Sequence, residues 1–414
     1  MAVAARLTAY GALLRIALRN TLRQRRRSGV AILAIAFGVI AMMLASGFIE
    51  WIFWASREGT AVTQIGHIQV VKPGYHQDGQ SDPFAYLLPA SVPGLGELER
   101  DPAIRAIAPR LNLNGLISHG DNTLTFLAMG VDPARDPSLL YLIIPEGSRL
   151  RPGDAEGILI GTGLAANLGV AVDDRVVLLA NTASGGINAV EARIQGLAST
   201  SMKAYDDTML WVPIDLARKL LRVAGAHVWV VSLHDTDRTD AVYARLERQA
   251  ALSHFEITPW YRLADFYNKT VQLLSRQIDV VKLIIATIIL IGITNTMTMN
   301  VMERTVEIGT AMALGARRRR VLALFLIEGT ALGALGGVVG ILVGYALAEL
   351  ISYIGIPMPP SPGMSRGFTA AIIVTPRIVV EALLLALVTT WLASLYPAWR
   401  ASRLVIVEAL RRNR

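Results

Sequence analysis

The residue types that perform enzyme chemistry are present in this sequence, but their spacing assembles no catalytic or metal site. The chain has no cysteine, which excludes disulfides, thiolate metal sites and cysteine nucleophiles. No GxSxG elbow or HExxH motif is present. We expect the scattered histidines to be exposed or in loops; they are His67, His76, His119, His227, His234 and His254. The sequence therefore predicts no catalytic residue and no metal site, and we expect that the protein is not an enzyme.

A glycine cluster, Gly161-Thr162-Gly163 with Gly169, is the nearest approach to a phosphate-binding loop. It lacks the Lys-Ser/Thr pair that such a loop requires, so turns and helix caps are the better interpretation. If the protein depends on ATP, we expect ATP and Mg²⁺ to bind a partner chain. This chain itself is expected to bind no cofactor.

Four long apolar runs indicate a membrane protein. The chain has 414 residues, of which 53% are hydrophobic and only 17% charged. A helix of about 20 apolar residues is long enough to cross a bilayer. The runs cover residues 30–49, 283–302, 321–348 and 382–399. These spans must position every other part of the molecule.

The distribution of charge predicts how the spans are oriented. The net charge is +8, yet Asp and Glu outnumber Lys and Arg between residues 55 and 277. Clusters of arginine flank the spans on one side, at 23–27, 317–320 and 400–414. Because basic residues stay on the cytoplasmic side, both termini and the segment 303–320 are expected in the cytoplasm. The high pI then follows from topology, and we expect no nucleic-acid partner.

These observations predict a fold class of four transmembrane α-helices with a large α+β domain between the first and the second. Alternating apolar residues predict strands at 67–71, 104–113, 124–130, 157–160, 175–180, 190–197 and 228–233. Helices are expected at 92–101, 164–168, 213–221 and 240–252, and a polar helix at 263–281 is expected to continue into the second span as a stalk. The predicted segments are a cytoplasmic amphipathic helix (1–28), the first span (29–54), the outer domain with its stalk (55–277), the second span (278–302), a cytoplasmic helix (303–320), the third span (321–350), an outer loop (351–377), the fourth span (378–399) and a cytoplasmic tail (400–414).

Small and polar residues within the spans indicate helix packing. Small residues spaced four apart allow helix backbones to approach closely. The third span has such a series, which we expect to serve helix packing: Gly333, Gly336, Gly337, Gly340 and Gly344. Glu328 is the only charge in the apolar run 321–348. It is either a contact in a conformational cycle or, more simply, a structural hydrogen-bond partner.

The segments around the third span resemble a known family. Glu307-Ile308-Gly309, Ala313-Leu314-Gly315-Ala316, Glu328-Gly329 and the closing run Tyr396-Pro397-Ala398-Trp399-Arg400 resemble the FtsX-like permease domain, over residues 278–410. The run Gly157-Ile158-Leu159-Ile160-Gly161, through Leu168-Gly169-Val170, resembles the MacB-like periplasmic core domain. The chain is thereby similar to the FtsX-like and MacB-like (type VII) ABC transporter permeases of the bacterial inner membrane, whose large domain is periplasmic.

Within this superfamily the length and domain order resemble the lipoprotein-releasing permeases LolC and LolE most closely. MacB proteins carry an ATPase domain before the first span, and FtsX division proteins have a much smaller outer domain. One departure concerns the Pro-rich hook loop of LolC, which recruits a periplasmic carrier. The corresponding turn here, 180–190, is short and lacks proline.

The resemblance implies a transporter membrane subunit that works with a cytoplasmic ABC ATPase dimer, a second permease copy or paralogue, membrane lipids and a periplasmic lipoprotein carrier. It implies ATPase coupling through Glu303, Arg304, Glu307, Ile308, Gly309, Ala313, Leu314, Gly315 and Ala316. For a lipoprotein cargo, acyl chains are expected against Met42, Met43, Leu44, Phe48 and Ile52. The alternatives are a MacB-like exporter of peptides or toxic small molecules and FtsX-like signalling to a periplasmic partner.

Overall fold

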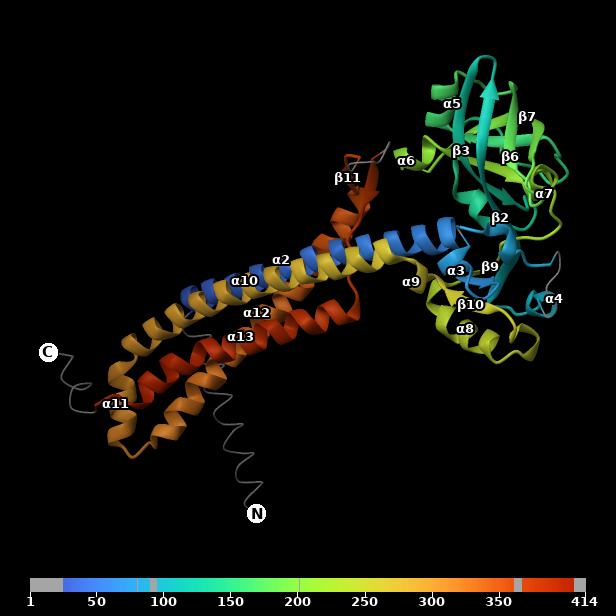
Figure 1. Cartoon of the computed structure of the whole chain (residues 1–414). Coiled ribbons are helices and arrows are strands. Elements are labelled where there is room, and N and C mark those ends of the chain that lie inside the picture. The colour runs from blue at the N-terminus through green and yellow to red at the C-terminus, as the bar shows by residue number, and fades with distance from the viewer. Residues whose placement is uncertain (1–24, 80, 90–94, 201, 361–366, 406–414) are drawn as a thin grey trace. The chain divides into compact units, whose positions relative to one another are not determined.

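The computed structural model describes residues 25–79, 81–89, 95–200, 202–360 and 367–405 (Figure 1). The chain divides into two compact units. A helical unit contains residues 1–53, 271–357 and 369–414, and an α/β unit contains residues 54–270 and 358–368. The predicted N-terminal amphipathic helix lies almost entirely outside the described residues.

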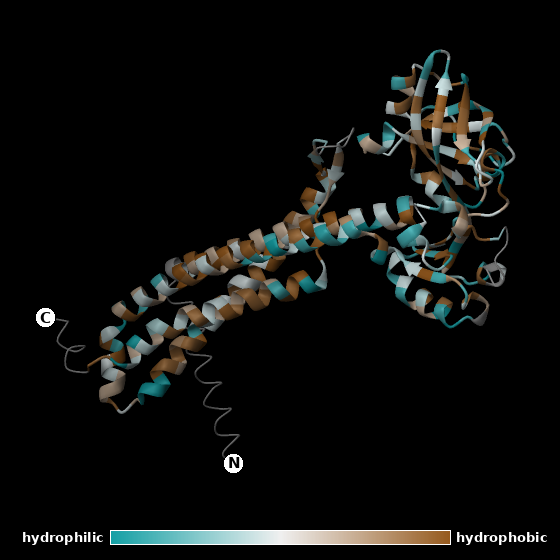
Figure 2. Cartoon of the chain, in the orientation of Figure 1, coloured by the Kyte–Doolittle hydropathy of each residue, from teal (hydrophilic) through white to brown (hydrophobic). Residues whose placement is uncertain are grey.

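Four long helices dominate the helical unit, and each is long and apolar enough to cross a membrane. Apolar residues, brown in Figure 2, cover most of their length. The unbroken course of α10 joins the predicted stalk and second span in one helix. The long helices are α2 (Arg25–Glu58), α10 (Asp265–Glu303), α12 (Arg318–Ile354) and α13 (Pro376–Ser402), and the short α11 (Thr305–Ala313) lies between α10 and α12.

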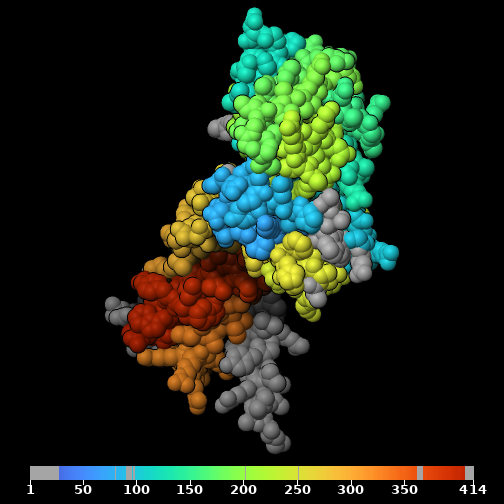
Figure 3. Space-filling model, turned by 45° about the vertical axis from the view of Figure 1, so that its right-hand side comes forward, coloured from blue at the N-terminus to red at the C-terminus, as the bar shows by residue number. Residues whose placement is uncertain are grey.

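All four long helices contribute to one apolar core. Helices α12 and α13 pack side by side, and their side chains form a continuous surface in the space-filling view of Figure 3. The core contains many small side chains, because helices in a lipid environment associate through close packing. Its buried members include Ala31, Ile35, Val39, Met42, Met43, Ile285, Ile289, Ile293, Met297, Leu332, Ala382, Ala386 and Ala393.

The α/β unit is built on a ten-stranded mixed sheet. The strand order is β10-β1-β9-β2-β3-β8-β5-β7-β4, and β6 pairs with both β2 and β7. The pairs β3/β8 and β5/β7 are parallel, whereas the others are antiparallel. The strands are β1 (Ile68–Val71), β2 (Ile104–His119), β3 (Asn122–Val131), β4 (Ile143–Gly147), β5 (Gly157–Gly161), β6 (Arg175–Asn181), β7 (Ile187–Ser199), β8 (Met209–Pro213), β9 (Val228–Leu233) and β10 (Glu256–Pro259).

Short helices cover parts of this sheet and close two separate cores. Helix α7 (Ile214–Leu221) packs on β2, β3, β6 and β7 over a core that includes Ile117, Phe126 and Leu178. Helix α8 (Thr239–Glu247) packs on β10 next to a second core around Val231 and Leu246. The remaining helices are α3 (Tyr75–Asp78), α4 (Leu95–Leu98), α5 (Thr162–Leu168), α6 (Lys203–Asp206) and α9 (Trp260–Leu263), with a π-helix at Gly59–Ile65.

The structure differs from the sequence prediction mainly in strand length and in short elements. Strand β9 has the predicted bounds, but β2 continues to His119 because its second half pairs with β3. Strands β4, β8 and β10 were not predicted. The predicted outer loop 351–377 also contains regular structure that was not expected, since α12 extends to Ile354 and β11 (Ile356–Met358) pairs with β12 (Phe368–Ala370) in a small two-stranded sheet.

Candidate functional site

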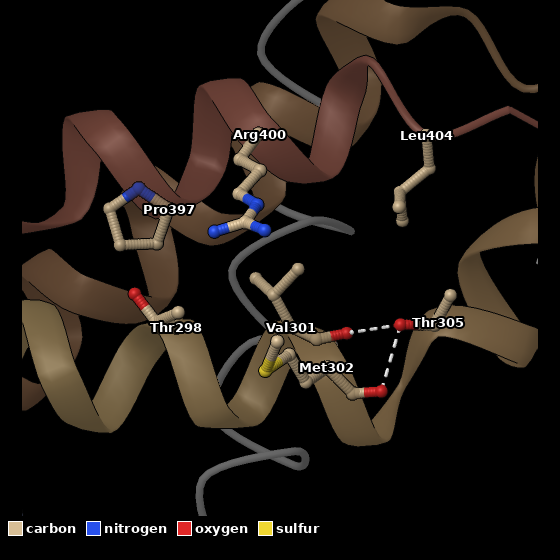
Figure 4. A pocket seen from close by; sticks show the side chains of 7 residues that line it. All are labelled: Thr298, Val301, Met302, Thr305, Pro397, Arg400 and Leu404. Atoms are coloured by element: carbon tan, nitrogen blue, oxygen red, sulfur yellow. Dashed lines mark hydrogen bonds between the residues drawn. The ribbon is translucent and has the colours of Figure 1, made fainter.

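The junction between α10 and α12 is the candidate site, because it contains the residues predicted to couple to an ATPase. A local hydrogen bond pattern ends α10 here. The Thr305 hydroxyl donates to the carbonyl oxygens of Val301 (3.0 Å) and Met302 (2.8 Å), which would otherwise lack partners at the helix end (Figure 4). Gly315, at a φ of 97°, ends the segment that follows α11, and α12 begins at Arg318. The predicted cytoplasmic helix 303–320 is thus one short helix between two breaks.

Helix α11 has a buried face and an exposed face. Ile308 and Gly309 are buried, and Ile308 belongs to an apolar cluster with Phe325 of α12 and Ala398 of α13. Arg304 and Ala316 are half-buried. The other predicted coupling residues are exposed: Glu303, Glu307, Ala313, Leu314 and Gly315. The structure therefore brings the nine residues together in one segment and presents five of them to the surroundings.

Arg304 connects α11 with α12. Its Nη1 lies 3.2 Å from Oε2 and 3.4 Å from Oε1 of Glu328, and its Nε lies 3.2 Å from Oε2 of Glu307. The guanidinium also lies over the ring of Phe325, 5.7 Å from the ring centroid. The Glu328 side chain is only 3% exposed. Glu328 thus has a charged partner that lies 24 positions earlier in the chain, which no local sequence pattern could reveal.

A small pocket lies beside this junction. It encloses about 60 Å³ between α10 and α13, and its lining combines the hydroxyls of Thr298 and Thr305 with the guanidinium of Arg400 (Figure 4). Sites for small molecules usually enclose about 300–1,000 Å³. The size of this pocket fits a few water molecules and no nucleotide or lipid. The remaining lining residues are Val301, Met302, Pro397 and Leu404.

The glycines of α12 lie at two helix contacts. A Cβ at Gly336 or Gly340 would lie 2.7 Å from the Cβ of Ile35 or Val39, and Gly344 faces Met43, so this edge packs on α2. A Cβ at Gly333 would lie 2.1 Å from the hydroxyl of Thr390, and Gly337 faces Leu383, so the other edge packs on α13. The contacts at Gly333, Gly336 and Gly340 leave no room for a Cβ unless the neighbouring helix shifts, which explains the small residues there.

The residues predicted to contact acyl chains separate into two groups. Met42 and Met43 are 1% and 0% exposed and pack inside the helix core. Leu44, Phe48 and Ile52 are half-buried. In this conformation only the second group is accessible to a ligand from the surface of α2.

Two histidines lie in loop segments, as expected, but both are buried rather than exposed. His67 and His227 are each 1% exposed. His67 Nδ1 accepts from the amide of Leu233 at 3.2 Å, and its Nε2 pairs with the Thr236 hydroxyl at 3.0 Å. Burial lowers the pKa of both imidazoles to about 4, so both are neutral at pH 7 and serve as structural hydrogen-bond groups. Among the described residues, no three His, Cys, Asp or Glu side chains gather closely enough to hold a metal ion.

Sequence reasoning also missed a buried ion pair in the α/β unit. Arg110 binds Asp136 through Nε (2.7 Å) and Nη2 (3.0 Å), and its Nη1 donates to the Gln64 carbonyl. The Ser138 amide and hydroxyl donate to the same carboxylate. Arg110 and these hydrogen bonds lower the pKa of Asp136 despite its burial. The only signal in the sequence was an arginine among the apolar residues of the predicted strand 104–113, which also contains Arg105.

Comparison with known proteins supports the family suggested by the motifs. Residues 280–406 match the FtsX-like permease C-terminal model, and residues 28–249, more than half of the chain, match the MacB-like periplasmic core domain. The chain is 26% identical over 416 residues to a macrolide export ATP-binding/permease protein MacB of Hyphomonas neptunium, covering 96% of this chain and 60% of the relative. It is 26% identical over 415 residues to a lipoprotein-releasing system transmembrane protein LolC of Xylella fastidiosa, covering 92% and 98%.

A solved structure shows a weaker similarity. The periplasmic region of MacB from Actinobacillus actinomycetemcomitans covers 52% of this chain and 97% of its own length, at 12% identity and a TM-score of 0.38. The family assignment therefore rests on the two sequence matches, which together cover residues 28–249 and 280–406. The protein is a multi-pass membrane protein with a periplasmic α+β domain between its first and second long helices, and it belongs to the FtsX/MacB family of ABC transporter permeases.

Proposed function

We propose that this chain is the permease subunit of a bacterial inner-membrane ABC transporter, driven by a separate ATPase dimer that docks on α11. The exposed face of α11 is the observation that carries the proposal. Together with the residues that directly flank α11, this surface presents two carboxylates, Glu303 and Glu307, and an apolar side chain, Leu314, that is 85% exposed. Its opposite face is fixed against α12 and α13. A rigidly backed surface of mixed apolar and charged groups suits a specific protein contact.

The exposed arginines 317–320 support a cytoplasmic position for this surface, since they directly follow it and basic residues remain inside. ATP-driven closure of the ATPase dimer would displace α11. Because α10 is continuous from Asp265 to Glu303, the displacement would travel along one helix toward the periplasmic domain. Transport by this route is mechanical and needs no hydrophilic path through the bilayer.

The cargo we propose is a lipoprotein or lipid extracted from the inner membrane for transfer toward the outer membrane. The similarity to LolC over 98% of that relative supports this choice. Leu44, Phe48 and Ile52 would contact the acyl chains. A second candidate, export of peptides or small toxic molecules, is supported by the equal identity to MacB, of which this chain spans 60%.

Changing Leu314→Arg tests the docking surface. The side chain is exposed, so insertion and folding should remain intact while ATPase binding and stimulated ATP hydrolysis fall at least tenfold. Val405→Arg is the matched control, since Val405 is 56% exposed and lies outside the predicted coupling segment 303–316. Gly309→Arg should also uncouple the complex, but burial of Gly309 makes it less specific. Unchanged transport by the Leu314→Arg complex in vesicles would refute the docking assignment.

Co-purification of the full-length chain from its native membrane, followed by mass spectrometry, tests the cargo. Bound triacylated lipoprotein or phospholipid in stoichiometric amount would support extraction. Bound peptide, together with a membrane-fusion adaptor, would favour export instead. ATP turnover without any transferred cargo would favour signalling to a periplasmic partner.

A further inference from the structure

The ion pair between Arg304 and Glu328 joins different helices of the bundle, in addition to neutralising a charge. Glu328 belongs to α12, in the third membrane span, where a carboxylate is costly without a partner. Arg304 is the residue between the end of α10 and the start of α11. Their side chains are 3% and 15% exposed. The carboxylate is thus buried and the guanidinium half-buried at the point where α10, α11 and α12 meet.

Arg304 has contacts on both sides of this meeting point. Its Nε binds Glu307 on α11, whereas its Nη1 binds Glu328 on α12. Its guanidinium plane also covers Phe325, one turn before Glu328. A displacement of α11 must therefore either carry α12 with it or separate a buried charge pair.

The residue after Glu328 fixes this part of α12 to its neighbours. A Cβ at Gly329 would lie 1.8 Å from Oγ of Ser394 on α13 and 3.0 Å from Cε of Met297 on α10. Any side chain larger than hydrogen at this position would collide with Ser394, so α12 and α13 are in direct contact here. Motion that reaches Glu328 is therefore passed to α13 at the next residue.

We propose that Arg304 and Glu328 form a charged joint that makes α11 and α12 move as one body, so that ATPase closure is passed to the whole helix bundle. The inference rests on the proposed function, since α11 must receive the ATPase. Arg304 is a positioning residue here, and it acts from the buried side of the docking surface. ATPase binding and force transmission are therefore separable by mutation.

Glu328→Gln tests the joint in the full complex with its ATPase, reconstituted in lipid vesicles. ATPase binding should stay within twofold of the unchanged complex, while cargo released per ATP hydrolysed falls at least tenfold. Glu381→Gln is the matched control. Glu381 pairs with Lys282 (2.7 Å) between α13 and α10, away from α11, and its loss should leave the coupling ratio within twofold.

The charge-exchanged double variant Arg304→Glu with Glu328→Arg separates a joint from a merely structural role. A coupling ratio in the double variant that recovers at least a third of what Arg304→Glu or Glu328→Arg alone has lost supports the joint. A normal coupling ratio in Glu328→Gln overturns it. If Arg304→Glu alone and Glu328→Arg alone both fail to fold, and the double variant does not restore folding, the joint is also overturned. If Leu314→Arg leaves ATPase binding unchanged, the proposed function itself fails; if Leu314→Arg uncouples while Glu328→Gln does not, only the joint fails.

Discussion

Two buried arginine–carboxylate pairs, one in each unit of the molecule, differ in how completely they are satisfied. In the α/β unit, Asp136 receives two bonds from Arg110 and two more from Ser138. In the helical unit, Glu328 receives only one nitrogen of Arg304, whose Nε is used by the exposed Glu307. The first pair is a closed network, whereas the second is shared between two helices. A closed network stabilises one local structure, whereas a pair shared between two helices links the position of one helix to that of the other.

The apolar cores of the two units also differ, in the size of the side chains that they bury. The α/β unit buries large side chains such as Phe126, Ile117 and Leu178 between a sheet and helices, where removal of apolar surface from water stabilises the fold. The helical unit relies on glycine and alanine at close backbone contacts, since lipid offers no comparable driving force. The α/β unit is therefore stabilised mainly by burial of large apolar side chains, and the helical unit by close contacts between helices.

The largest expected effect tests the closed network. Arg110→Ala leaves the Asp136 carboxylate buried without its counter-ion, which typically costs about 3–5 kcal/mol. We expect the α/β unit to lose most of its stability while the helical unit remains folded. Hydrogen–deuterium exchange of peptides from β2 and β3, compared with peptides from α12, measures both. Equal loss of protection in the two units would show that they do not fold independently.

Acidification should affect the α/β unit more than the helical unit. The pKa of His67 and of His227 is about 4 in the folded protein and about 6.5 when unfolded, so the unfolded chain binds more protons between these values. Stability should therefore fall as the pH decreases from 6.5 to 4, by roughly 3 kcal/mol for each histidine. The lowered pKa of Asp136 adds a further loss only at lower pH, as its carboxylate becomes protonated.

Urea titrations of the α/β unit at several pH values, followed by tryptophan fluorescence, measure this dependence. His67→Gln should reduce the slope of stability against pH by about half. His254→Gln, in which the exposed imidazole is lost, serves as the control. An unchanged slope in His67→Gln would contradict the assignment of a neutral buried imidazole.

Glycine substitutions in the helices test the close contacts. Gly340→Ala places a Cβ 2.7 Å from Val39 and 2.9 Å from the Ala36 carbonyl, so α2 and α12 must separate, at a cost of about 1–3 kcal/mol. Gly292→Ala is the matched control on α10, where a Cβ would meet no atom within 4 Å. Thermal unfolding in detergent should distinguish the two variants. Equal unfolding temperatures would mean that the α2/α12 contact is not close in the membrane.

The sequence was sufficient to predict the elements whose length and polarity are dictated by their surroundings. The spans follow from bilayer thickness, and β9 follows from a short apolar run between turn residues. The break at Arg304 could not be predicted, because it depends on which carbonyls the Thr305 hydroxyl reaches. The partners of Glu328 and Asp136 depend on contacts between distant residues, so the sequence could identify Glu328 as unusual without naming its partner.

The smallest expected effect concerns an ion pair at the surface of the α/β unit. Lys203 and Asp207 lie 3.0 Å apart within one turn, and the Lys203 side chain is 68% exposed. Exposed pairs at this spacing contribute about 0.5 kcal/mol or less, since water screens both charges. Lys203→Ala should therefore leave the urea midpoint of the α/β unit nearly unchanged at low and at high salt. A loss comparable to that of Arg110→Ala would mean that charge pairing itself, rather than burial of a saturated network, stabilises this unit, and the contrast between the two buried pairs would then lose its physical basis.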